Sequence, residues 1–291
     1  MKKFGYFLKS LLPFIIFELL QYGVTFGLMI GLGVLHFMQS SDGSSVYEYI
    51  SSLTADTNFT QLVSVVFAVI VIFVFGIWYR RVFVRPMKGR QRKYWTGISF
   101  QTLVSLIFLA FGLQYLAQLV TGIVSELRPD WMSTYEAILE SAGYSSVTIL
   151  LLAYALILAP IGEELTFRGL TYRFARRALP FWAANILQAL LFGIMHANMI
   201  QGIYAFAVGL ILGWVCRVGH SIKYSVILHI LFNILGTLFY SLFTMTEAIN
   251  ETAAYGIGIL LLIFGMLIYR WEHNRKNRKR SRTGRKKRRQ N

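Results

Sequence analysis

The chain has 291 residues, of which 56% are hydrophobic and 14% are charged. Soluble domains carry roughly 25% charged residues, so this composition excludes an ordinary water-soluble fold and indicates a membrane protein. The formal net charge of +16 comes largely from Lys and Arg in residues 270–289. No folded module for reading nucleic acid accompanies that run, so we do not expect a nucleic-acid partner. The single cysteine, Cys216, excludes an internal disulfide and is expected to be a packing residue in its apolar run.

Eight apolar segments follow one another along the chain. They cover residues 11–37, 60–79 and 96–124, a fourth segment that begins near residue 145, and residues 181–197, 201–218, 222–245 and 253–271. The first is too long for the core of a cleavable signal peptide, so we expect it to remain as a transmembrane helix. No Pro-, Gly- or Ser-rich linker divides the series. The sequence therefore predicts an all-α fold, a polytopic membrane helix bundle of about eight transmembrane helices.

The charges between the segments predict how the bundle is oriented. Every Lys and Arg except Arg128 falls on one side of the alternating loops, and such loops face the cytosol. Both termini are therefore expected in the cytosol, and the short loops favour a prokaryotic plasma membrane. Residues 272–291 form a basic tail that is too charged to pack. We expect this tail to be disordered and to contact anionic lipid headgroups.

Ionisable residues recur inside the apolar runs between residues 159 and 236, which is costly in hydrocarbon and marks candidate functional residues. Glu164 and Arg168 are four residues apart and can pair on one helix face. Glu163 points about 100° away from Glu164, which leaves it available for proton transfer.

Two histidines extend this set. His196 lies near the end of the fifth segment, and His229 shares one side of the seventh segment with Asn233. Each has an alternative interpretation, as an interfacial residue or as an interhelical hydrogen-bonding group. The same holds for Glu18 in the first segment, which we interpret as a carboxylate near the cytosolic interface.

The depth of Glu163 sets a condition on the fourth helix. If that helix ended at Gly162, His196 would lie roughly 22 Å deeper in the membrane than Glu163. The two side chains could not then share a water molecule. We therefore predict that the fourth helix continues to about Arg177, just before Pro180.

Three short motifs follow one another in this region. Residues 163–168 read EELTFR and fit EExxxR, residues 192–196 read FGIMH and fit FxxxH, and residues 229–233 read HILFN and fit HxxxN. In this order they resemble the motifs of the CAAX-processing and bacteriocin-processing (CPBP, also called Abi) intramembrane proteases. The similarity covers residues 159–236, the motif core of a membrane protease domain that would span residues 1–271.

The resemblance implies a glutamic-type peptide hydrolase that works inside the membrane. Glu163 would activate a water molecule together with His196. His229 and Asn233 would polarise the scissile carbonyl and hold its oxyanion. Glu164 and Arg168 would be supporting residues, and no cofactor is expected. The implied substrate is a membrane-associated peptide or lipidated protein, either a prenylated CAAX protein or a precursor peptide.

Three alternatives stay open. Glu163, His196 and His229 could supply three ligands to a catalytic zinc ion, although no close-spaced pair such as HExxH is present. The chain could instead be a non-catalytic immunity or scaffold protein of the same fold. A secondary transporter could use the cluster as a proton relay, but such transporters favour internal repeats and none is evident.

Overall fold

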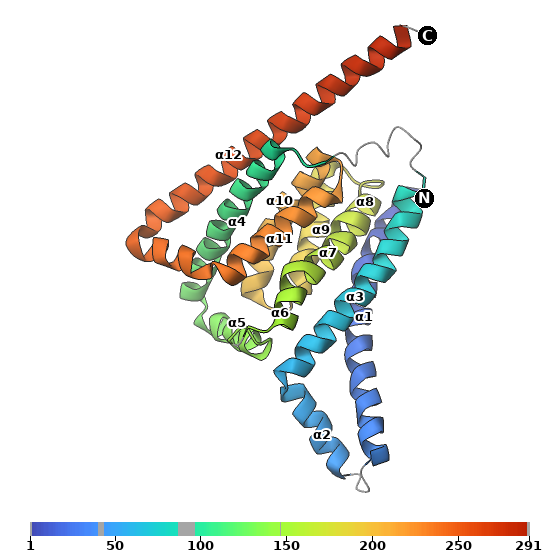
Figure 1. Ribbon diagram of the computed structural model, residues 1–291, viewed down its shortest axis with the longest axis vertical. Coiled ribbons are helices and arrows are strands. Elements are labelled where there is room, and N and C mark those ends of the chain that lie inside the picture. The colour runs from blue at the N-terminus through green and yellow to red at the C-terminus, as the bar shows by residue number, and fades with distance from the viewer. Residues whose placement is uncertain (1, 40–43, 87–96, 146, 290–291) are drawn as a thin grey trace. The chain divides into compact units, whose positions relative to one another are not determined.

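The computed structural model describes residues 2–39, 44–86, 97–145 and 147–289, apart from the side chains of residues 44, 45, 246–249, 277 and 279–289. These residues form helices and connecting turns, with no strand among them (Figure 1). The prediction of an all-α fold is confirmed. The chain divides into two compact units, Met1–Pro86 with Ile123–Leu210, and Met87–Gly122 with Ile211–Asn291.

The first unit holds the helix that carries Glu163 and the helices packed around it. Its elements are α1 (Lys2–Gln39), α2 (Ser44–Ala55), α3 (Thr57–Tyr79), η1 (Arg80–Val84), α5 (Pro129–Ser141), α6 (Ile149–Ala153), η3 (Tyr154–Leu158), α7 (Ala159–Glu164), η4 (Leu165–Thr171), α8 (Tyr172–Ala175) and α9 (Phe181–Met195). Helix α10 (Met199–Gly219) belongs to this unit as far as Leu210.

The second unit is built on three helices, together with the end of α10: α4 (Phe100–Leu127) as far as Gly122, α11 (Ile222–Leu238) and α12 (Tyr240–Arg289). Gly112 on α4 lets α12 approach closely, because a Cβ there would lie 2.7 Å from the backbone nitrogen of Leu262. Tyr115 and Phe243 pack edge to face with their centroids 5.1 Å apart. These contacts form the apolar core that supports α11.

Among the described residues, six helical stretches are long and apolar enough to cross a membrane: Lys2–Gln39, Thr57–Val84, Phe100–Leu127, Ile149–Ala175, Met199–Gly219 and Asn250–Lys276. The fifth and seventh predicted segments correspond to the shorter apolar helices α9 and α11, of 15 and 17 residues. At 1.5 Å per residue these helices are about 22 and 26 Å long, somewhat less than a bilayer core of about 30 Å. The chain is an integral membrane protein with a polytopic helix bundle.

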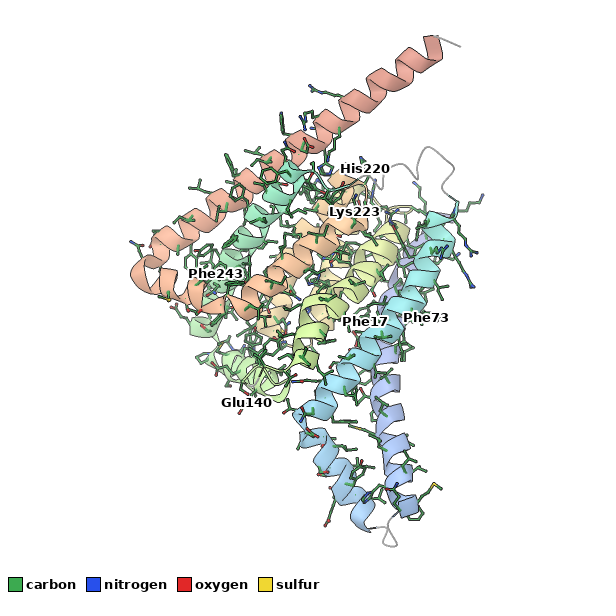
Figure 2. All side chains as sticks on the ribbon, in the orientation of Figure 1. Phe17, Phe73, Glu140, His220, Lys223 and Phe243 are labelled. Carbon is green, nitrogen blue, oxygen red and sulfur yellow. The ribbon has the colours of Figure 1, made fainter. Side chains whose placement is uncertain are left out.

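Large apolar side chains remain exposed along these spans. Phe73 on α3 (labelled in Figure 2) is 68% exposed and Leu260 on α12 is 66% exposed, whereas Phe243 is fully buried. Soluble proteins rarely expose contiguous apolar surface of this kind. In a bilayer the same faces contact lipid tails, which accounts for the apolar segments from which the fold was predicted.

The fourth predicted helix continues well past Gly162, as expected, because residues Ile149–Ala175 form one uninterrupted helical span. The span contains two π-helical segments, η3 and η4, one on each side of α7. The amide of Ala159 bonds to the carbonyl of Tyr154, and that of Tyr172 to the carbonyl of Phe167. π-Helical turns occur frequently at functional sites. Here they flank the segment that carries Glu163 and Glu164.

Two helices in the predicted polar loops were missed. Helices α2 and α5 lie between the predicted apolar segments, where no helix was expected. Their apolar residues recur at helical spacing, but the segments are too short and too polar to have been predicted as spans. The basic loop predicted after the second segment extends into residues 87–96, which lie outside the described residues.

The C-terminal tail also differs from the prediction. Helix α12 has a break at Asn250, where φ is −161° and ψ is 100°, and it then continues through the basic run to Arg289. The Asn250 Oδ1 accepts a hydrogen bond of 2.9 Å from the amide of Ala253 and so caps the following helix. Lys and Arg are good helix formers, and cations are favourable near a helix C-terminus. These two effects explain a helical tail where the charge density predicted disorder.

Candidate active site

Glu164 and Arg168 form the ion pair that their spacing predicted. The Arg168 Nη1 donates a hydrogen bond of 2.7 Å to the Glu164 Oε1, and neither side chain is exposed. Arg168 also donates through Nη2 to the carbonyl of Gly209 at 3.2 Å and lies 4.4 Å from the ring centroid of Phe192. The pair therefore joins the helix that carries Glu163 to α9 and α10.

Gly209 permits this junction. A Cβ at Gly209 would lie 3.1 Å from the Cα of Ala189 and 3.3 Å from the Arg168 Nη2. The carbonyl of Gly209 accepts a second hydrogen bond, of 2.9 Å, from the Nε2 of Gln188. The small residue thus allows α10 to approach α9 and gives the buried guanidinium an acceptor.

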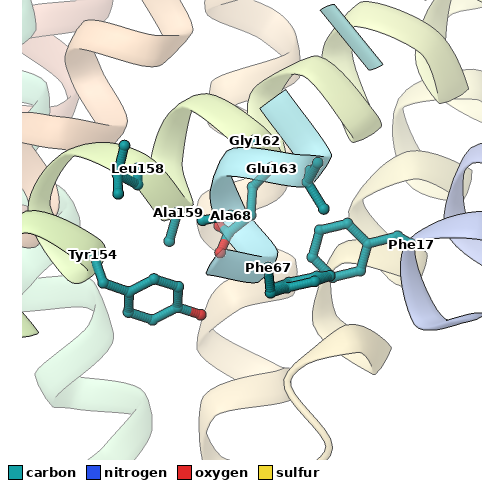
Figure 3. A pocket seen from close by; sticks show the side chains of 9 residues that line it. Phe17, Phe67, Ala68, Tyr154, Leu158, Ala159, Gly162 and Glu163 are labelled. Atoms are coloured by element: carbon teal, nitrogen blue, oxygen red, sulfur yellow. The ribbon is translucent and has the colours of Figure 1, made fainter. Parts of the chain in front are cut away.

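Glu163, which precedes the paired Glu164 in the sequence, is half-buried. It lines a pocket with about 200 Å³ of empty space, part of which opens to the surroundings. The other walls of this Glu163 pocket are mostly apolar and come from α1, α3 and the beginning of the same helical span (Figure 3). Phe17, Phe67 and Val71 lie on α1 and α3, and Tyr154 lies on η3. A carboxylate beside such a cavity can act on a water molecule placed there.

Two tyrosines interact electrostatically with Glu163. The Tyr154 hydroxyl and the Glu163 carboxylate point into the same cavity (Figure 3). Tyr144 lies beyond α5, outside the spans, and desolvation followed by the charges of Tyr135 and Glu163 raises the pKa of Tyr144 to about 12. Tyr144 therefore remains neutral at physiological pH. Neither tyrosine was predicted as a site residue, although Tyr154 is a polar residue in an apolar run nine positions before Glu163.

His196 ends α9, and its ring is held by the preceding turn. Its Nδ1 lies 2.8 Å from the carbonyl oxygen of Phe192. A carbonyl can only accept, so Nδ1 carries the proton and Nε2 keeps the lone pair that a general base needs. The Phe192 ring packs edge to face against the imidazole, with centroids 5.0 Å apart.

The backbone after His196 turns sharply into α10. Ala197 has a φ of 55°, in the left-handed region. Asn198 then donates from Nδ2 to the carbonyl of His196 at 3.0 Å, and its Oδ1 accepts from the amide of Gln201 at 2.8 Å. Asn198 thus caps α10 and fixes the turn that carries His196. Its position just before an apolar helix was the sequence signal for this role.

His229 and Asn233 lie on α11 in the second unit, and His229 is 4% exposed. Between them, the carbonyl of Phe232 accepts a hydrogen bond of 2.6 Å from the Nε2 of Gln114 on α4. A Cβ at Gly236 would lie 2.7 Å from that nitrogen, so the glycine makes room for the amide. Gln114 therefore holds the part of α11 that carries both residues.

The structure places Glu163 and His196 in the first unit and His229 and Asn233 in the second. The meeting of all four side chains therefore stays a prediction. The zinc alternative likewise needs ligands from both units. Within the part of the chain that the structure describes, no three His, Cys, Asp or Glu side chains form a group that could hold a metal ion.

The comparison with known families matches the same part of the chain. Residues 145–235 match the family model Rce1-like, described as type II CAAX prenyl endopeptidase Rce1-like. Neither the curated proteins nor the solved structures gave a match to this chain. The matched residues contain all three motifs and every predicted site residue, so the resemblance inferred from the motifs is confirmed. Over residues 145–235 the chain is therefore similar to the Rce1-like type II CAAX prenyl endopeptidases.

Proposed function

We propose that the protein is an intramembrane endopeptidase of glutamic type that cleaves a lipidated, membrane-associated peptide or protein. The observation that carries this proposal is the division of labour between two adjacent carboxylates. Glu164 takes the buried ion pair with Arg168, while Glu163 lines a cavity. The family match over residues 145–235 supports the same class of substrate, a prenylated chain.

The chemistry needs one base and one oxyanion site. Glu163 accepts a proton from a water molecule, which His196 orients through Nε2, and the water oxygen attacks the scissile carbonyl carbon. The negative charge that develops on the carbonyl oxygen is stabilised by His229 and Asn233. When the C–N bond breaks, Glu163 returns its proton to the leaving nitrogen. The products are a new carboxylate and a free amine.

The substrate and the membrane orientation belong to the same proposal. The mostly apolar side chains around Glu163 suit contact with a lipid-modified chain, since only a few polar groups lie among them. We infer that both termini lie in the cytosol, because the basic loops fall on that side. The basic end of α12 would then lie against anionic lipid headgroups.

Product analysis tests this proposal. The purified full-length protein in lipid nanodiscs is incubated with a farnesylated peptide and with the same peptide lacking the farnesyl group. Mass spectrometry should show a C-terminal fragment released from the farnesylated peptide at least tenfold faster. Cleavage of neither peptide would contradict the proposal, and equal cleavage of both would contradict the lipidated substrate. Addition of a chelator tests the zinc alternative, which requires that cleavage be lost and then restored by zinc.

A further inference from the structure

Like Glu163, Glu18 on α1 is a carboxyl group that Arg168 does not neutralise. It lies within the first membrane span, Lys2–Gln39, and is half-buried. Its Oε1 is shielded from solvent and makes no hydrogen bond to any described residue. The ion pairs of the described residues do not include it either. The expected position at a polar interface does not account for a shielded, unpartnered oxygen.

The neighbours of Glu18 face the candidate active site. Phe17, the preceding residue, lines the pocket that contains Glu163 (Figure 3). Its ring packs edge to face against Phe67, with centroids 5.0 Å apart. Phe14, one turn before Glu18 and on the same helix face, packs against the cluster of Phe167, Phe192 and Ala205. The Phe192 carbonyl accepts the hydrogen bond from the His196 ring. This face of α1 therefore packs toward the helical elements that carry Glu163 and His196.

An unpartnered carboxyl oxygen in an apolar helix destabilises the folded protein, and a leucine would remove that penalty. Buried polar groups without a partner occur where a ligand, a water molecule or a reaction completes them. A carboxyl group accepts hydrogen bonds in either protonation state, and in its protonated form it also donates one. A peptide group offers the matching acceptor and donor.

We propose that Glu18 is a substrate-binding residue whose carboxyl group hydrogen-bonds the peptide backbone of a chain lying in the Glu163 pocket. This inference rests on the proposed function, which supplies the peptide. It adds a polar residue on α1 to those that contact the substrate. Glu18 binds and orients the chain, and it takes no part in moving the proton of the attacking water.

The test uses two substitutions with opposite predictions. Glu18→Leu should raise KM for a farnesylated peptide about tenfold, because a hydrogen bond to the substrate is lost, and should lower kcat less than threefold. The same variant should unfold at a temperature equal to or above that of the wild type. Glu18→Gln, which keeps both hydrogen-bonding functions, should restore most of the affinity. Gln21→Leu, an exposed residue on the same helix, is the matched control and should leave KM unchanged.

An unchanged KM in Glu18→Leu would overturn the inference, as would a loss of activity explained by a lower unfolding temperature. A binding measurement without turnover tests the role of Glu18 independently of whether the protein cleaves the peptide. In a Glu163→Gln background, fluorescence anisotropy of a labelled farnesylated peptide in nanodiscs gives Kd directly. Adding Glu18→Leu should weaken Kd about tenfold. Equal Kd values, or no binding in either background, would also overturn the inference.

Discussion

The guanidinium of Arg168 lies 2.7 Å from the carboxylate of Glu164, and neither side chain is exposed. The adjacent residue, Glu163, faces a cavity instead. Two neighbouring residues of the same type therefore have different environments, one fully neutralised and one beside open space. This difference is the basis on which the two carboxylates receive different roles.

Removing Arg168 should lower the free energy of unfolding of the protein. Arg168→Met leaves the Glu164 carboxylate buried without its cation, which costs about 3–5 kcal/mol. The free energy of unfolding in mixed micelles measures the change. The double variant Glu164→Gln/Arg168→Met should recover most of the loss, because no buried charge remains. Arg128 also forms an ion pair, with Asp130, but its side chain is 49% exposed. Arg128→Met should therefore leave stability unchanged, and a similar loss in both Met variants would contradict the argument.

Gly209→Ala should destabilise the junction of α9 and α10. The added Cβ would lie 3.1 Å from the Ala189 Cα and 3.3 Å from the Arg168 Nη2. Forcing these atoms apart costs about 1–3 kcal/mol. Gly23 on α1 is the control, since a Cβ there meets nothing within 4 Å, and Gly23→Ala should stabilise the helix by about 0.5–1 kcal/mol. Thermal unfolding distinguishes the two, and equal effects would show that the close approach does not matter.

Asn198→Ala should weaken both the fold and the activity. The variant loses the cap on the Gln201 amide and the contact with the His196 carbonyl. A lost cap costs about 0.5–2 kcal/mol. Because the turn that positions His196 becomes looser, kcat should fall more than KM rises. If stability drops while kcat remains at the wild-type value, Asn198 caps the helix without positioning the histidine.

Tyr154→Phe should slow cleavage without unfolding the protein. The ring remains in the pocket wall, while the hydroxyl that points into the same cavity as Glu163 is removed. We expect this hydroxyl to donate a hydrogen bond to the negative charge that develops in the cavity during cleavage. Such a bond contributes about 1.5–3 kcal/mol, so kcat/KM should fall at least tenfold. Tyr204→Phe is the control. Its hydroxyl lies 3.4 Å from that of Tyr135, and its loss should change kcat/KM less than twofold. Equal rates for wild type and Tyr154→Phe would show that the hydroxyl takes no part.

The spacing of charged residues was the most informative feature of the sequence. A separation of four residues predicted the Glu164–Arg168 pair, which the structure contains. The depth required for Glu163 to reach His196 predicted a fourth helix that continues past Gly162, and that helix runs to Ala175. Both predictions rest on helix geometry, which apolar spans follow closely because lipid offers their backbone no alternative partner.

The π-helical segments on either side of Glu163 had no comparable signal. Whether a helix adds a residue to one turn depends on the packing of its neighbours. Gly169 illustrates this dependence, since a Cβ there would lie 3.3 Å from the ring of Tyr79 on α3. The hydrogen bond from Gln114 to Phe232 joins residues 118 positions apart, a distance over which no periodic pattern operates. The surroundings of Tyr154 and Glu18 could not be predicted for a related reason, because they depend on side chains from other helices.

The most direct test of the account compares wild type with Glu163→Gln in lipid nanodiscs, using a quenched farnesylated peptide, with and without chelator. Glu140→Gln, an exposed glutamate on α5, serves as the control for loss of one carboxylate. The account predicts that Glu163→Gln reduces kcat at least a thousandfold while Glu140→Gln and the chelator leave it unchanged, since the general base alone is removed. Cleavage by correctly folded Glu163→Gln at the wild-type rate would contradict the account.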